Sequence, residues 1–267
     1  MNKQKSQDPE TLRNVRIPVE PLIPECEVCE KQKANFYCTE CKVHYCENCE
    51  SQVHTSFWKR KHNGFIFQEP YIPQEKSEIL QKENNLKFNK ILQKWIKEAG
   101  CNLNLQRRFN SRTDGWKYQT FHEKCDNKGK SIVLIKLKNK SLFGVFAAID
   151  WDSKSERKHS NGNKSFLFSL ISLDPNFKEP LKMHVFRHQN CEICCDPDDV
   201  PVFGWGHDLH LGSGYYNQDM NEYNRSDLGF SYKPPFGYKY GSNEAKNFLA
   251  GSYRNWDIFQ IEIFCEN

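Results

Sequence analysis

The sequence predicts an α+β protein: a small zinc-binding module, a linker helix, and then a two-sheet antiparallel β-sandwich with flanking short helices. Three observations lead to this class. Cysteine and histidine crowd into residues 26–62, apolar side chains recur at helical spacing before residue 100, and short apolar or alternating segments follow it. A chain of 267 residues has room for one medium-sized domain beside a small one.

Composition and charge restrict the function. The formal net charge of +4 is too small to indicate nucleic-acid binding by itself, and no basic strand is interleaved with aromatic residues. The sequence has no apolar run of membrane length and no apolar N-terminal signal segment. We therefore expect a cytoplasmic protein without membrane insertion, in which stable disulfides are rare.

The changes in composition along the sequence divide the chain into four predicted segments. Residues 1–25 carry four prolines and little apolar pattern, which predicts an extended or disordered tail. The other predicted segments are the zinc-binding module at 26–64, a linker with an amphipathic helix at 65–100, and the sandwich domain at 101–267.

The spacing of the donors predicts the metal. Pairs two residues apart let both thiolates of a tight turn reach one ion, and thiolate and imidazole suit zinc. Eight donors in four pairs suffice for two tetrahedral ions, and the spacing alone leaves open whether the pairs close in sequence or interleave. The donors are Cys26, Cys29, Cys38, Cys41, Cys46, Cys49, His54 and His62.

Residues 26–62, including the ending "CESQVHTSFWKRKH", resemble a B-box zinc finger. The resemblance implies an interleaved, cross-braced pairing and a module that contacts other proteins. It assigns the first zinc to Cys26, Cys29, Cys46 and Cys49, and the second to Cys38, Cys41, His54 and His62. With all eight positions filled, both sites are closed to water, so we expect a structural role and no catalysis there.

The segment "EKSEILQKENNLKFNKILQKWIKEAG", residues 75–100, is predicted to be a helix ending near Gly100. Its apolar stripe covers about two heptads, too few for a coiled coil, so we expect it to be buried on the following domain. The stripe contains Phe88, Ile91, Leu92, Trp95, Ile96 and Ala99. Lysines 87, 90, 94 and 97 form a basic face that could meet an acidic surface.

Beyond residue 101 the pattern predicts strands. A short helix at 120–129, ended by Gly129, precedes them. The predicted strands cover 131–137, 141–149, 164–173, 183–186, 201–211 and 255–266. Short strands of this kind, joined by short turns, favour antiparallel sheets packed as a sandwich.

Five ordered motifs in this half resemble the TLDc domain, from about residue 103 to residue 264. They are "SRTDGWKYQTFHEKCDNKGKSIVLIK", "LFGVFAAIDW", "KSFLFSL", "VFGWGHDLHL" and "FLAGSYRNWDIFQIEIF". The resemblance implies a β-sandwich flanked by helices. It also implies a link to the vacuolar proton pump or to protection against oxidative stress.

No catalytic or cofactor-binding residue is predicted. His122, His207 and Asp208 invite an acid–base interpretation, but no nucleophile motif or phosphate-cradling glycine loop accompanies them. Cys125 lies near Lys124 and Lys128, which would lower the pKa of its thiol, yet a buried small apolar side chain is the expected role.

The segment "RHQNCEICCDPDD" interrupts the TLDc-like pattern. Two-residue cysteine spacing there suggests a third zinc site, but no second distant pair completes a cage. We expect two zinc ions, and we expect the acidic "DPDD" at residues 196–199 to be a surface turn. The residues concerned are His184, His188, Cys191, Cys194 and Cys195.

These features predict a non-enzymatic, zinc-binding scaffold of a large intracellular assembly. A basic helix and the basic run from Lys124 to Lys140 suit an acidic partner such as tubulin, together with other axonemal proteins in the cilium of a protist. The alternatives are a regulator of the vacuolar proton pump or stress-protective adaptor, and an accessory subunit in ubiquitin transfer.

Overall fold

The computed structural model divides the chain into two units, residues 1–68 and residues 69–267, which are described one at a time. Within them the structure describes residues 26–32, 36–38, 43–46, 48–49, 64–66, 77–83, 85–101, 104–154, 156–160, 162–196, 201–212 and 219–266.

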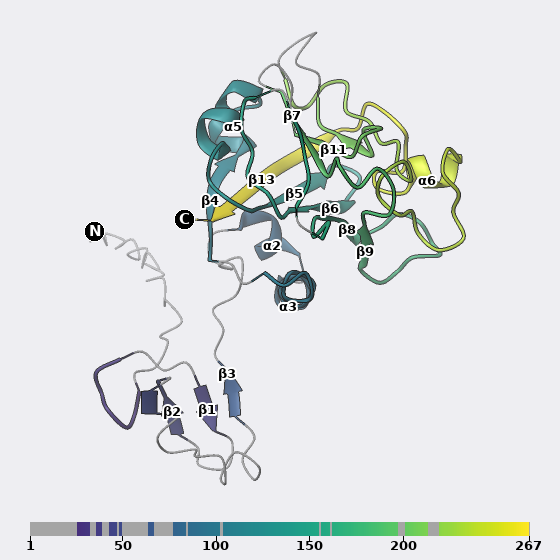
Figure 1. Cartoon of the computed structure of the whole chain (residues 1–267). Helices are drawn as coiled ribbons and strands as arrows, with labels where there is room; N and C mark the ends of the chain where they lie inside the picture. The colour runs from purple at the N-terminus through teal and green to yellow at the C-terminus, as the bar shows by residue number, and fades with distance from the viewer. Residues whose placement is uncertain are drawn as a thin grey trace, which may run out of the picture. The chain divides into compact units, whose positions relative to one another are not determined.

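The first unit contains a small antiparallel sheet with the strand order β2-β1-β3 (Figure 1). Its strands are β1 (Phe36–Cys38), β2 (Val43–Tyr45) and β3 (Gly64–Ile66). The buried side chains described in this unit are Tyr45 and three cysteines, Cys26, Cys46 and Cys49. Sulfur therefore takes the place that hydrocarbon has in an ordinary core.

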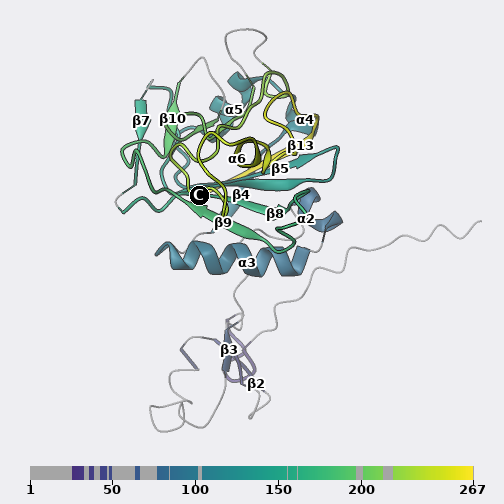
Figure 2. The same ribbon diagram turned by 90° about the vertical axis from the view of Figure 1, so that its right-hand side faces the viewer.

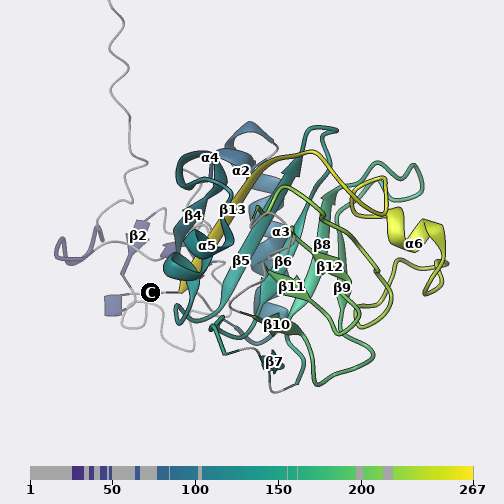
Figure 3. The same cartoon turned by 90° about the horizontal axis from the view of Figure 1, so that it is seen from above.

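The second unit is built on a six-stranded antiparallel sheet with the order β4-β13-β5-β6-β8-β9. Figure 3 shows the C-terminal strand β13 between β4 and β5. The strands are β4 (Leu105–Asn110), β5 (Ser131–Leu137), β6 (Leu142–Ala147), β8 (Phe166–Ile171), β9 (Leu181–His184) and β13 (Ile258–Glu266).

A four-stranded antiparallel sheet, in the order β12-β11-β10-β7, covers one face of the larger sheet. Its strands are β7 (Glu156–Lys158), β10 (Ile193–Cys195), β11 (Val202–Phe203) and β12 (Leu209–His210). Val133 and Ile135 of β5 share a buried cluster with Ile193 and Phe203 of the smaller sheet. The predicted two-sheet antiparallel sandwich with short helices is confirmed.

Helices cover the opposite face of the six-stranded sheet (Figure 2). The alternate residues Ile132 and Leu134 of β5 point to this side, where they cluster with Leu92 and Ile96 of the long helix α3. The predicted burial of the apolar stripe on the following domain is thus confirmed. The helices of the unit are α2 (Glu78–Lys82), α3 (Asn85–Glu98), α4 (Ser111–Asp114), α5 (Tyr118–Cys125) and α6 (Asn243–Asn247).

Gly144 shows how tightly the helix face of the sheet is packed. A Cβ atom at this position would lie 2.0 Å from the Val133 carbonyl oxygen and 2.7 Å from Cζ of Phe168. Only glycine leaves room for the Phe168 ring to lie over β6. Position 144 therefore requires glycine because a side chain there would collide with the Phe168 ring.

Several predicted elements differ from the structure. The helix expected at 75–100 is replaced in the described residues by two helices, α2 and α3. Ser77 caps the start of α2, and the chain leaves helical geometry at Glu83. The helix expected at 120–129 is α5, at 118–125, and it ends before Asn127 and Gly129, which have φ of +56° and +69°. The strand expected at 201–211 is the pair β11 and β12, separated by a turn.

The insertion contains a strand that was not predicted, while residues 197–199 of the predicted surface turn lie outside the described residues. Residues 193–195 form strand β10, which pairs with β7 on one side and with β11 on the other. Ile193 and Cys195 are buried in the sandwich core. The insertion therefore supplies an inner strand of the smaller sheet.

Candidate metal centre

The thiols of Cys26, Cys29, Cys46 and Cys49 form one cluster in the first unit. Their sulfur atoms all lie within 4.8 Å of one another, and Cys29 Sγ lies 3.8 Å from Cys46 Sγ. Four thiolates around a tetrahedral zinc at about 2.3 Å stand about 3.8 Å apart, so the spacing fits this ion. The set matches the first ligand group that the B-box resemblance implies.

Local structure places these thiols. Residues 27–29 form a turn in which the Glu30 N–H donates to the Cys26 carbonyl at 2.8 Å, which brings the first two cysteines together. Cys46 follows directly after β2, and Cys49 lies three residues further on. The two pairs flank the hairpin of β1 and β2, so pairs distant in sequence share one site.

The electrostatics of the cluster favour a cation. Burial raises the pKa of the Cys26 thiol, but backbone N–H groups of Cys46, Cys29 and Val28 outweigh it and lower the pKa to about 6. Burial and the neighbouring thiols raise the pKa of Cys49 to about 12. Several thiolates at this spacing repel one another, and a divalent cation removes that repulsion.

The second predicted ligand group cannot be placed in the same way. Cys38 is the last residue of β1, while Cys41, His54 and His62 lie outside the described residues. The donor set of the first group, four sulfurs, is the chemistry of a closed structural zinc site.

The third candidate group does not converge. Cys191 Sγ and Cys194 Sγ are 3.4 Å apart, but the His188 ring stacks on Phe230 at 4.6 Å and Cys195 belongs to the sandwich core. Within the part of the chain that the structure describes, a group of three or more metal donors occurs at the four-thiol cluster of the first unit alone. A third zinc site is therefore not supported by the described side chains.

His122, Asp126 and Ser153 lie together at the end of α5. Nδ1 of His122 lies 3.1 Å from each Asp126 carboxylate oxygen, and the Ser153 hydroxyl donates to the same carboxylate at 2.5 Å. Ser153 Oγ is 3.4 Å from that same ring nitrogen. In a hydrolytic triad serine and carboxylate bind opposite ring nitrogens, so this trio lacks the geometry of a nucleophile relay.

Asp208 organises a loop. Its buried carboxylate accepts hydrogen bonds at 2.8–3.1 Å from four consecutive backbone N–H groups, those of Gly229, Phe230, Ser231 and Tyr232. Burial raises the pKa of Asp208 to about 7, against the lowering effect of these donors. The neighbouring His207 faces elsewhere, with Nδ1 2.5 Å from an Arg225 nitrogen.

Cys125 is fully buried in the sandwich core cluster. The neighbouring Cys265 thiol and burial raise the pKa of Cys125 well above its usual value, and Lys124 lowers it only slightly. The expected buried, apolar role fits this environment, and a thiol with a lowered pKa does not.

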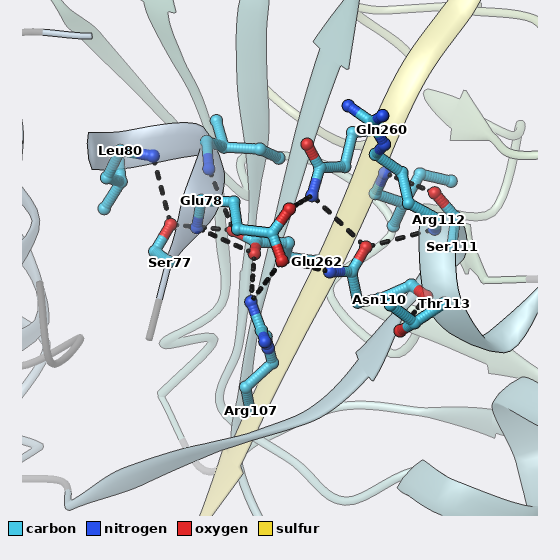
Figure 4. A network of polar contacts seen from close by, with 12 residues as sticks. Ser77, Glu78, Leu80, Arg107, Asn110, Ser111, Arg112, Thr113, Gln260 and Glu262 are labelled. Atoms are coloured by element: carbon cyan, nitrogen blue, oxygen red, sulfur yellow. Dashed lines mark hydrogen bonds and ion pairs between the residues drawn. The ribbon is translucent and has the colours of Figure 1, made fainter. Parts of the chain in front are cut away.

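A buried polar network under α2 was not predicted (Figure 4). The Glu262 carboxylate, fully buried on β13, accepts from Ser77 Oγ at 2.7 Å, the Glu78 N–H at 3.0 Å and Arg107 at 2.8 Å. A carboxylate at a helix N-terminus satisfies its open N–H groups. The network fixes α2 to β4 and β13.

The cluster and the sandwich define a zinc-binding protein-interaction module. The chain belongs to the TLDc domain family, whose model matches residues 73–265. A second family model, the B-box zinc finger, matches residues 23–63. Both resemblances are thereby confirmed, although the TLDc match begins upstream of the predicted boundary at 101 and includes α2 and α3. A search of curated proteins finds no match.

The structure also bears on the membrane. None of the helices in the described parts of the chain combines the length and the apolar character that a membrane crossing requires.

Proposed function

We propose that the chain is a non-enzymatic scaffold of a large intracellular assembly, and that its TLDc unit docks on an acidic protein surface. The observation that carries the proposal is a rigid turn that presents an aromatic side chain to solvent. Phe236 is 95% exposed, which is exceptional for a phenylalanine.

The turn is held by its neighbours. The Tyr238 N–H donates to the Pro235 carbonyl at 3.0 Å, and Gly237 takes a φ of +91°, which glycine adopts without strain. Tyr238 fixes the turn to the body, because its hydroxyl donates to Asp174 and its ring packs edge-on against Phe177. Because the backbone of the turn is already ordered, binding through Phe236 costs little backbone conformational entropy.

Charge around the turn points to the kind of partner. Lys233 and Lys239 flank Phe236, and both are exposed. An apolar anchor between two cations fits an apolar pocket with carboxylates on its rim.

The basic run from Lys124 to Lys140 contributes less than its sequence suggests. Four of its six lysines form ion pairs with carboxylates of this chain. The pairs are Lys124–Asp114, Lys130–Glu266, Lys136–Glu83 and Lys138–Asp257. The exposed lysines beside Phe236 are therefore the stronger support for an acidic partner.

Tubulin in a ciliary microtubule is the partner that this proposal names first. The second candidate is a subunit of the vacuolar proton pump, which family membership favours. The zinc finger would then be a further contact surface of the same scaffold.

Co-sedimentation of the full chain with polymerised tubulin tests the proposal. Phe236→Ser is expected to weaken binding about tenfold or more, as loss of an interface anchor does. The control is Leu173→Ser, at an apolar residue that is 48% exposed and lies outside the turn, and it should bind as the parent does. A pull-down tests the second candidate. Recovery of proton-pump subunits with the parent protein, but not with the Phe236→Ser variant, favours it. Binding that both variants retain for both partners contradicts the docking turn.

A further inference from the structure

Cys191 and Cys194 form a thiol pair at the entrance to β10. Their sulfur atoms are 3.4 Å apart, with Cys191 fully buried and Cys194 partly exposed. Neither residue belongs to the zinc cluster of the first unit or to the docking turn.

Glu192, which follows Cys191, is fixed by hydrogen bonds of its backbone and of its side chain. The buried Glu192 donates its N–H to the Lys158 carbonyl at 2.7 Å, and its own carbonyl accepts from the Tyr232 hydroxyl at 2.9 Å. Its carboxylate accepts from the N–H groups of Ser160 and Ser165 at 2.7 and 2.9 Å. Glu192 therefore has almost no freedom to move.

The flanking residues are fixed as well. Ile193 is fully buried in the sandwich core, and the Cys191 N–H donates to the His188 carbonyl at 2.9 Å. His188 is itself held by stacking on Phe230. The backbone thus keeps the two thiols together before any reaction, which raises their effective concentration toward each other.

Cys195 is excluded from the pair by strand geometry. Successive side chains of a strand point to opposite faces, so Cys194 and Cys195 diverge. Cys195 packs in the core cluster between the sheets, and burial raises its pKa to about 12. The pair is therefore specific to Cys191 and Cys194.

We propose that Cys191 and Cys194 are a redox site, a dithiol that a peroxide oxidises to an intrachain disulfide and that a thiol reductant reopens. This inference is independent of the proposed docking function, because it needs no partner protein.

The two thiols have different roles. Cys194 is partly exposed, so a peroxide can reach its sulfur, whereas Cys191 is fully buried. The hydrogen bond with Cys194 and burial raise the pKa of Cys191, so that residue stays protonated. Cys194 is the attacking thiol, and Cys191 resolves the intermediate.

The reaction balances in two steps. The Cys194 thiolate attacks one peroxide oxygen, the O–O bond breaks, and a sulfenic acid and an alcohol or water form after the leaving oxygen takes a proton. The Cys191 sulfur then attacks the sulfenic sulfur, the S–S bond forms, and the hydroxyl leaves as water with the Cys191 proton. The two sulfurs lose two electrons, which reduce the peroxide.

Peptide mapping of the full, zinc-loaded chain tests the site. The protein is treated with hydrogen peroxide and unfolded in denaturant, its remaining thiols are alkylated, and it is cut with trypsin. Residues 188–225 form one tryptic peptide with three cysteines, Cys191, Cys194 and Cys195. We expect one alkyl group, on Cys195, and a mass two hydrogens below that of the peptide with two free thiols.

Variants separate the proposal from other oxidation. Cys195→Ser should form the same bridge, whereas Cys194→Ser should form none. Cys191→Ser should accumulate a sulfenic acid on Cys194, which dimedone traps. Three alkylated cysteines after a peroxide dose that oxidises free glutathione, or a bridge that includes Cys195, would overturn the proposal. So would a zinc ion that is lost on Cys191→Ser substitution.

Discussion

The two units of this chain use cysteine in opposite ways. In the first unit four thiols converge within 4.8 Å and occupy the centre of the module. In the second unit Cys101, Cys125 and Cys265 lie among apolar side chains and pack as small hydrophobic groups. Two-residue spacing alone does not separate these uses, because Cys191 and Cys194 share it; in the first unit two such pairs converge on one point.

Size explains the difference. About forty residues bury too little apolar surface to fold alone, and metal coordination replaces the missing core. The second unit has almost two hundred residues and buries both faces of a six-stranded sheet, one against another sheet and one against helices. Its stability is expected to come from apolar burial.

Loss of one zinc ligand is expected to have the largest effect. Cys46→Ser removes a thiolate whose metal site contributes on the order of 10 kcal/mol to folding of the small module. Native mass spectrometry should show one zinc fewer per chain than in the parent. Cys101→Ser, a buried cysteine of the second unit, is the control and should keep the parent's zinc content. Equal zinc in all three proteins contradicts the assignment.

Removal of Arg107 is expected to cost the second unit about 4 kcal/mol, because Glu262 is left as a buried charge without its cation. Urea unfolding of Arg107→Leu, followed by tryptophan fluorescence, measures the loss. Arg112→Leu, at an exposed arginine on nearby α4, should change the free energy of unfolding by less than about 1 kcal/mol. If the two variants are equally stable, the network under α2 does not anchor it.

Truncation of the helix face tests whether α3 belongs to the core. Leu92 is fully buried against the sheet, so Leu92→Ala should lower the free energy of unfolding by about 3 kcal/mol. Lys97→Ala, on the exposed side of the same helix, serves as the matched control and should have little effect. A Leu92→Ala protein as stable as the control would mean that α3 is a dispensable linker.

The smallest expected effect depends on pH. Burial raises the pKa of Asp114, but the Lys124 ammonium and the Asn110 N–H outweigh it and hold the pKa below its usual range. The ion pair therefore stabilises the fold above about pH 4 and is lost as the pH falls through the lowered pKa. Lys124→Met should lose about 0.5 kcal/mol at pH 7 and less under acid.

Chemical unfolding at pH 7 and at pH 3 measures that difference. Lys138→Met is the control, since its ion pair with Asp257 is 3.9 Å long and largely exposed. A stability loss in Lys124→Met that grows as the pH falls would have the wrong sign.

The features that depend on residues close together in the sequence were predicted correctly. Strand β5 was predicted with the bounds that the structure has, because apolar residues fill it and a turn ends it. The amphipathic stripe predicted the burial of α3, and the resemblance of the cysteine pairs to a B-box implied the four-thiol cluster. In each case, the residues that fix the feature are near one another in sequence.

Features that depend on distant partners were not predicted. Glu262 meets Ser77 across 185 positions, so nothing near either residue reveals the contact. Strand β10 is defined by its hydrogen bonds to β7 and β11, and its three residues carry no readable alternation. The break between α2 and α3 lies at Glu83, whose carboxylate forms an ion pair with Lys136 of the distant strand β5.

Hydrogen exchange of the full chain, with and without a zinc chelator, tests most directly whether metal organises one unit and apolar burial the other. After metal removal, peptides that cover β1, β2 and β3 should lose their protection, while β5 and β13 keep theirs. Unchanged protection across residues 26–66 once all zinc has been stripped, or loss of protection in β5 and β13 as well, would contradict this account.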